Sequence, residues 1–134
     1  MLVEDAESLR KLTRSFLESH GFQVLVAQNG EEAIQVEAQH SGKIDLLLTD
    51  VVMPGMNGRV LSEKLQPKQP GMRVLYISGY ADSFIAGHGV LERGMVLLHK
   101  PYTEDALIGK VREVLDQGYP PAAGRKTGEL SNQD

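Results

Sequence analysis

Five polar residues that could bind a metal ion or a phosphoryl group follow apolar runs of the chain. Glu4 and Asp5 follow the first run, Asp50 ends the third, and Ser78 and Lys100 end the fourth and fifth. Three carboxylates brought together repel one another and raise each other's pKa unless a cation lies among them. Oxygen ligands too few for a full cage favour Mg²⁺ that retains several waters. The three acids therefore predict a magnesium site if the fold brings them together.

Asp50 is the central residue of this group and lies in the stretch "DLLLTDVVMPGMNG". A carboxylate is a known phosphoryl acceptor, through an acyl phosphate. The ammonium of Lys100 and the hydroxyl of Ser78 complement an anion with several acceptor oxygens, such as a phosphoryl group. A backbone carbonyl near Val52 would add one oxygen ligand for the metal. Together these residue types predict phosphoryl chemistry at Asp50.

The apolar runs predict a sheet that would bring these residues to one edge. Strands are expected at 1–3, 22–27, 44–49, 72–78 and 95–99. Helical spacing between them is clearest at Leu9, Leu12, Phe16, Leu17, Leu107, Val111, Val114 and Leu115. Strict strand–helix alternation predicts a five-stranded parallel α/β sheet with helices on both faces. Such sheets bind ligands at the carboxyl ends of their strands, where the five polar residues would lie.

Local signals predict where helices begin and end. Asn29 with Glu32 resembles a capping box, and Thr103 is a candidate N-cap. Helix ends are expected at Gly21, Gly42, Pro67 and Gly118. Gly55 and Gly58 suit turns that need a positive φ. A fourth helix near 83–88 should be brief because two glycines interrupt it.

Length and composition limit the domain organisation and the partners. The 134 residues fit one domain, expected over 1–117, with a polar, Gly- and Pro-containing segment 118–134 as a disordered tail or linker. The net charge of -4 gives no electrostatic reason to expect nucleic-acid or membrane binding. Without cysteine there is no disulfide or thiol nucleophile. No signal peptide or membrane span is visible, and we expect a cytoplasmic protein.

With these residues in view, the chain resembles the receiver domain of two-component response regulators over 1–117. The resemblance rests on Glu4-Asp5, Asp50 followed by "VVMPGMNG", Ser78-Gly79 and Lys100-Pro101. It implies a flavodoxin-like sheet with strand order 2-1-3-4-5. It also implies that Asp50 accepts a phosphoryl group from the phosphohistidine of a histidine kinase or histidine phosphotransfer domain, or from a small phosphodonor. Mg²⁺ would be bound by Asp5, Asp50 and the Val52 carbonyl, with Glu4 assisting through water.

Four longer stretches of the sequence indicate which kind of receiver the chain resembles. The stretches "LLTDVVMPGMNGR", "VLYISGYAD", "HGVLERGMVLLHKPY" and "KVREVLD" are more similar to receivers appended to sensory histidine kinases than to those preceding a DNA-binding domain. The resemblance further implies a cis Lys100-Pro101 bond and a readout face built from 78–115, and it is compatible with a weak homodimer. Such a domain catalyses only its own phosphorylation and dephosphorylation.

Two departures from the family pattern affect the expected kinetics and switching. Leu97 stands where many receivers carry an aromatic residue that moves inward on activation, so aromatic gating in its usual form is not expected. Val52 and Tyr80, two positions beyond Asp50 and Ser78, cannot position an attacking water as a carboxylate or amide does. We therefore expect slow autodephosphorylation, on the order of minutes or longer, because no general base adjoins the acyl phosphate.

Three other functions are compatible with an α/β sheet, but the residues favour a phosphoacceptor over each of them. A haloacid-dehalogenase-like phosphatase carries a second Asp two residues after its nucleophile, where this chain has Val52. A pseudo-receiver would bind partners without phosphorylation, which the complete set of acids, hydroxyl and lysine disfavours. A flavodoxin-like cofactor binder would need a Gly-rich phosphate loop after the first strand, and none is present. The histidines, His99 among them, show no metal-binding spacing.

Overall fold

A five-stranded parallel sheet forms the centre of the molecule in a computed structural model that describes residues 1–79 and 95–116. Its order is β2-β1-β3-β4-β5, which confirms the predicted fold class and strand order. The strands are β1 Leu2–Val3, β2 Val26–Ala27, β3 Leu46–Asp50, β4 Arg73–Ser78 and β5 Leu97–His99. The first strand is short, as predicted, and β2 covers only the end of the expected run 22–27.

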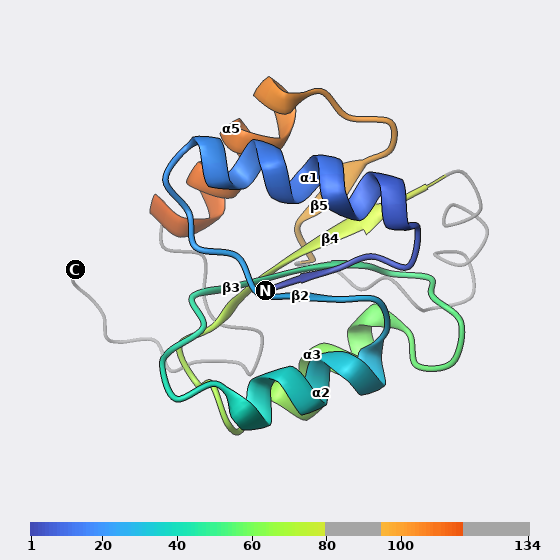
Figure 1. The fold of residues 1–134 in the computed structure, drawn as a ribbon, viewed down its shortest axis with the longest axis vertical. Helices are drawn as coiled ribbons and strands as arrows, with labels where there is room; N and C mark the ends of the chain where they lie inside the picture. Colours follow the sequence, from blue (N-terminus) through green and yellow to red (C-terminus); the bar gives the residue numbers. More distant parts are fainter. Residues whose placement is uncertain (80–94, 117–134) are drawn as a thin grey trace.

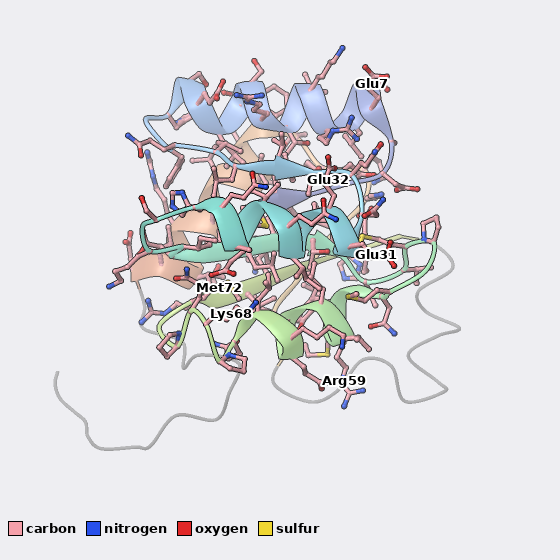
Figure 2. All side chains as sticks on the ribbon, turned by 60° about the horizontal axis from the view of Figure 1, so that its bottom comes forward. Glu7, Glu31, Glu32, Arg59, Lys68 and Met72 are labelled. Atoms are coloured by element: carbon pink, nitrogen blue, oxygen red, sulfur yellow. The ribbon has the colours of Figure 1, made fainter. Side chains whose placement is uncertain are left out.

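Helices cover both faces of this sheet. Figure 1 shows α1 (Glu7–Ser19) and α5 (Glu104–Asp116) above the sheet, with α2 (Gly30–Gln39) and α3 (Gly58–Leu65) below it. Figure 2 looks onto the α2 and α3 layer, with Glu31 and Glu32 at the start of α2. The predicted helix near 83–88 and the predicted tail 118–134 lie outside the described residues. The domain boundary at 117 therefore stays a prediction.

The core is divided by the sheet into two apolar clusters. Leu47 of β3 is 0% exposed and packs with Leu61 of α3, while its neighbour Leu48 is 2% exposed and packs with Leu107 of α5. Successive strand residues point to opposite faces, so a strand covered on both sides must be apolar at every position. This is why the run before Asp50 has no alternation, and why β3 can hold a carboxylate firmly at its end.

Side-chain caps begin three of the helices. Asn29 Oδ1 accepts a hydrogen bond of 2.8 Å from the Glu32 amide, and Thr103 Oγ1 accepts one of 3.0 Å from the Ala106 amide. Both caps were predicted. Glu32 Oε1 accepts from the amide of Gln28, one residue before the cap, and not from Asn29 itself. Asn57, whose cap was not predicted, accepts a hydrogen bond of 2.8 Å from the Val60 amide and caps α3 in the same way.

The predicted helix ends are partly right. Gly21 has a φ of 93° just after α1, and Pro67 directly follows Gln66, the C-cap of α3. Gly42 is a wrong prediction, because α2 already ends at Gln39 and its C-cap is His40 in an extended conformation. Gly118 lies outside the described residues.

One residue that contributes to the helical spacing is exposed, and one glycine prediction needs correction. Leu12 is 49% exposed and does not belong to the buried stripe of α1. Thr13 is the buried neighbour, and its hydroxyl lies 2.8 Å from the hydroxyl of Tyr102, which joins α1 to the loop after β5. Gly55 has the expected positive φ of 80°, but Gly58 does not. Gly58 is needed because a Cβ there would overlap the backbone carbonyl oxygen of Asp50.

Candidate functional site

The carboxylates of Glu4, Asp5 and Asp50 come together at the carboxyl edge of the sheet. One oxygen from each lies within 4.8 Å of the others. The first two residues directly follow β1, and Asp50 is the last residue of β3, the strand that pairs with β1. Neighbouring parallel strands end at the same edge, so the sheet itself places these acids side by side.

Glu4 is fixed by the loop between β1 and α1. Its side chain is 1% exposed, and its Oε2 accepts a hydrogen bond of 3.0 Å from the Ala6 amide. Arg10 donates a hydrogen bond of 2.8 Å to the Glu4 backbone carbonyl. Asp5, by contrast, is exposed at the rim of the cluster. The site therefore combines two buried carboxylates with one that solvent reaches.

Lys100 supplies the opposing positive charge. Its Nζ lies 3.1 Å from Asp50 Oδ1 and 3.4 Å from Glu4 Oε1. The residue follows β5, and its amide donates a hydrogen bond of 2.8 Å to the Ser78 carbonyl. The bond from Lys100 to Pro101 is cis, as the resemblance implies. The loop after β5 thereby holds the ammonium over the two buried acids.

The electrostatics of the cluster favour a proton or a cation. Burial and the charge of Glu4 raise the pKa of Asp50 to about 7, although Lys100 acts in the opposite direction. Burial lowers the pKa of Lys100, but the charges of Asp50 and Glu4 outweigh it, and the net pKa lies above its ordinary value. One ammonium thus does not compensate both buried carboxylates, because like charges in a poorly solvated site disfavour ionisation.

The donor atoms present fit a small divalent cation. Glu4 Oε1 and Asp50 Oδ1 are buried and, although Lys100 lies near both, accept no hydrogen bond of normal geometry from the described residues. Buried carboxylate oxygens without such partners are unfavourable unless something else binds them. With Asp5 beside them, the set is all oxygen, the ligand type that Mg²⁺ prefers.

The loop after β3 shapes the entrance to this cluster. Val52 lies two residues beyond Asp50, and its side chain is 45% exposed. A hollow of about 230 Å³ opens beside Asp5, lined also by Asn29, Gly30, Pro54, Gly55 and Met56 among others. A larger hollow of about 630 Å³ is lined by Met1, Phe22, Lys43 and other residues at the opposite, amino end of the strands. The smaller hollow is therefore the one of the two that lies at the edge of the sheet that carries the acids, where Asp5 lines it.

Ser78, the remaining predicted site residue, is the last residue of β4 and is 3% exposed. Its Oγ lies 2.9 Å from Nδ1 of His99. The spacing of the histidines along the chain predicted no role for His99. The signal that would have found it is its place at the end of a strand beside the one that carries Ser78.

Comparison with known proteins agrees with this geometry. The family model of the response regulator receiver domain matches residues 1–112. The chain is 32% identical over 117 residues to the sensor kinase CckA of Brucella abortus, covering 87% of this chain and 12% of that protein. It is also 32% identical over 120 residues to the transcriptional regulatory protein GlrR of Escherichia coli, covering 90% of this chain and 27% of that protein.

A solved structure extends the comparison to the fold. The receiver domain of the hybrid histidine kinase CckA is 32% identical and superposes with a TM-score of 0.70, over 86% of this chain and 96% of that one. The fold of this chain thus has a counterpart in a known receiver, and the relatives include a receiver of the hybrid-kinase type. The chain belongs to the response regulator receiver domain family of two-component signalling.

Proposed function

We propose that Asp50 is the phosphoacceptor of this receiver and that it takes a phosphoryl group in a Mg²⁺-dependent reaction. The donor would be the phosphohistidine of a histidine kinase or histidine phosphotransfer domain, or a small acyl phosphate. The observation that carries the proposal is the position of the Asp50 carboxylate between two other acids and the Lys100 ammonium, 3.1 Å away.

The residues have separate tasks in this proposal. An oxygen of ionised Asp50 attacks phosphorus, the new O–P bond forms as the P–N or P–O bond of the donor breaks, and the donor leaves with the bonding electron pair. Asp5, Asp50 and the Val52 carbonyl would hold Mg²⁺, with Glu4 assisting through water. When bound, the cation supplies positive charge to the transferred phosphoryl oxygens. Lys100 pairs with Asp50 beforehand and afterwards binds the acyl phosphate.

Phosphorylation would act as a switch because it adds about 1.5 to 2 negative charges and new acceptor oxygens. Lys100 lies 3.1 Å from Asp50 Oδ1, and Ser78, at the end of β4, could be drawn toward those oxygens and donate to them. Their movement would alter the 78–115 face, the proposed readout surface. Leu97, at the position of the usual aromatic residue, is partly buried against the apolar cluster that contains Leu47 and Leu61 (the α2–α3 cluster), so aromatic gating in its usual form is not expected.

The proposal covers this domain and not the protein that contains it. The chain spans 12% and 27% of the two curated relatives described above. A place within a hybrid histidine kinase, a cytoplasmic location and a weak homodimer are therefore parts of the proposal. Across residues 1–79 and 95–116, the structure contains no helix suited to crossing a bilayer.

The test is phosphorylation by acetyl phosphate with MgCl₂, followed by intact-protein mass spectrometry. We expect one phosphoryl adduct on the wild type and none on Asp50→Asn or in excess EDTA. Asp45→Asn, in the segment before β3, is the matched control and should be phosphorylated normally. An unmodified wild type would favour a pseudo-receiver, whereas sustained hydrolysis of external phosphate esters would favour a phosphatase.

A further inference from the structure

Ser78 and His99 form a side-chain pair across β4 and β5. They are register partners in the parallel sheet, and Ser78 Oγ lies 2.9 Å from His99 Nδ1. The serine is 3% exposed, whereas the imidazole is exposed to solvent. A hydroxyl as buried as that of Ser78 needs a protein partner, because water reaches it poorly. Among the described residues, His99 provides that partner.

The pair lies on the side of the sheet opposite the Asp50 carboxylate. Side chains alternate along a strand, so Ser78 shares a face with Tyr76, which packs in the α2–α3 cluster. Asp50 shares a face with Leu48, which packs in the α1–α5 cluster. In the unphosphorylated domain, the contact of Ser78 with His99 therefore directs its hydroxyl away from the acceptor carboxylate.

The chemistry of a hydroxyl makes the two positions of Ser78 compete. A serine hydroxyl carries a single proton, so it donates to one acceptor at a time. A proton donated to the imidazole nitrogen of His99 is not available to a phosphoryl oxygen on Asp50. The oxygens of an acyl phosphate accept strongly, because hydrogen bonds to charged groups exceed those to neutral ones. Phosphorylation would thus have to draw the hydroxyl away from His99.

We infer that His99 is a positioning residue that holds the Ser78 hydroxyl in the unphosphorylated domain, so that phosphorylation proceeds against this hydrogen bond. The inference rests on the proposed role of Asp50 and goes beyond it, because it names what opposes the switch. This role requires the neutral His99 tautomer that carries its ring hydrogen on Nε2, so that Nδ1 accepts from the Ser78 hydroxyl; no covalent bond forms or breaks. One neutral hydrogen bond changes such an equilibrium by roughly threefold to tenfold.

The test compares two substitutions of this exposed histidine. His99→Leu removes the acceptor, while His99→Asn keeps a side-chain oxygen close to the place of Nδ1. Phosphorylation by acetyl phosphate with MgCl₂ is followed at pH 8, where imidazoles are generally neutral. We expect the phosphorylated fraction at limiting phosphodonor, expressed as a ratio to the unphosphorylated form, to rise threefold to tenfold in His99→Leu and to stay near wild type in His99→Asn.

Repeating the His99→Leu substitution in a Ser78→Ala variant distinguishes a positioning role of His99 from a general effect on the fold. In Ser78→Ala, which has no hydroxyl to hold, His99→Leu should change nothing further. Equal behaviour of the Leu and Asn variants, or a Leu effect that persists without the Ser78 hydroxyl, would overturn the inference.

A spectroscopic readout separates this inference from the phosphoacceptor proposal. The ¹⁵N signal of His99 Nδ1 should shift in unphosphorylated Ser78→Ala relative to wild type, because the nitrogen loses its hydrogen bond. In phosphorylated wild type it should move in the same direction. A signal insensitive to Ser78→Ala would refute the contact itself. If the signal shifts but the wild type takes up no phosphoryl group, the phosphoacceptor proposal fails and with it the opposing role, while the contact stands.

Discussion

The Nζ atom of Lys100 lies 3.1 Å from Oδ1 of Asp50, although Asp50 ends β3 and Lys100 follows β5. The same ammonium lies 3.4 Å from Glu4 Oε1. Three loops therefore converge on one buried cluster in which a single positive charge faces two buried negative ones. This charge imbalance should govern the stability, metal binding and phosphorylation of the domain.

Removing the ammonium should impair both phosphorylation and stability. Lys100→Met would leave Glu4 and Asp50 without their cation, which we expect to lower the phosphorylated fraction at least tenfold and the free energy of unfolding by about 1–3 kcal/mol at pH 8. Acetyl-phosphate labelling and urea unfolding measure the two effects. Lys110→Met is the control, since its ion pair with Glu113 lies on the surface of α5 and should matter little.

The raised pKa of Asp50 predicts a pH-dependent stability. The folded domain binds this proton more tightly than the unfolded chain, so the stabilisation is full below the ordinary pKa of about 4 and is lost as pH rises to about 7. Asp50→Asn, which is neutral at every pH, should therefore be more stable than wild type at pH 8 in EDTA, by about 1–3 kcal/mol. Urea unfolding from pH 4 to pH 8 tests this. Parallel stability curves for the two proteins would contradict it.

Magnesium should offset the loss of stability that the ionised carboxylate of Asp50 causes. Because a ligand that binds only the folded state stabilises it by mass action, MgCl₂ should raise the melting temperature of the wild type at pH 8, and EDTA should reverse the change. Asp5→Asn should weaken the response, since Asp5 is one of the three clustered acids. Glu7→Gln alters an exposed acid of α1 that pairs with Lys11, and its response should remain that of the wild type. A response that Asp5→Asn leaves intact would place the cation elsewhere.

The acyl phosphate should decay slowly once formed. Val52, with its exposed apolar side chain, stands two positions beyond Asp50 and cannot act as a general base or orient a water. Tyr80, the other position considered, lies outside the described residues. Phosphate release from isolated phosphorylated protein should take on the order of minutes or longer. Release complete within seconds would show that another group positions the attacking water.

Gly58 should be required for the geometry of the acceptor loop. A Cβ at this residue would overlap the carbonyl oxygen of Asp50, and its amide donates a hydrogen bond of 2.8 Å to Val51 O. Gly58→Ala should lower the free energy of unfolding by about 1–3 kcal/mol, because one side of the clash is rigid backbone. Gly109→Ala is the control. A Cβ at this position in α5 meets nothing within 4 Å, so we expect a gain of about 0.5–1 kcal/mol.

The sequence alone determined the family, the sheet and the identity of the polar residues at its edge. Apolar runs and helix caps are local signals, and four motifs in the right order at strand ends are specific enough to identify a receiver. Hence the strand order and the caps at Asn29 and Thr103 were predicted correctly. The local pattern does not show which residues of a helix are buried, because burial depends on neighbours in space. Leu12, at a periodic position of α1, is exposed, whereas Thr13 is buried against Tyr102.

Tertiary structure decided the distances, the burial and the partners. Spacing could not give the contact of Lys100 with both Glu4 and Asp50, or the desolvation that raises the pKa of Asp50, because these depend on loops from separate strands packing together. Residue spacing also could not predict the contact between Ser78 and His99, because the register of parallel strands pairs residues that are distant along the chain. Chemistry at a sheet edge is set by which strands are neighbours, and only the folded chain fixes that at atomic distance.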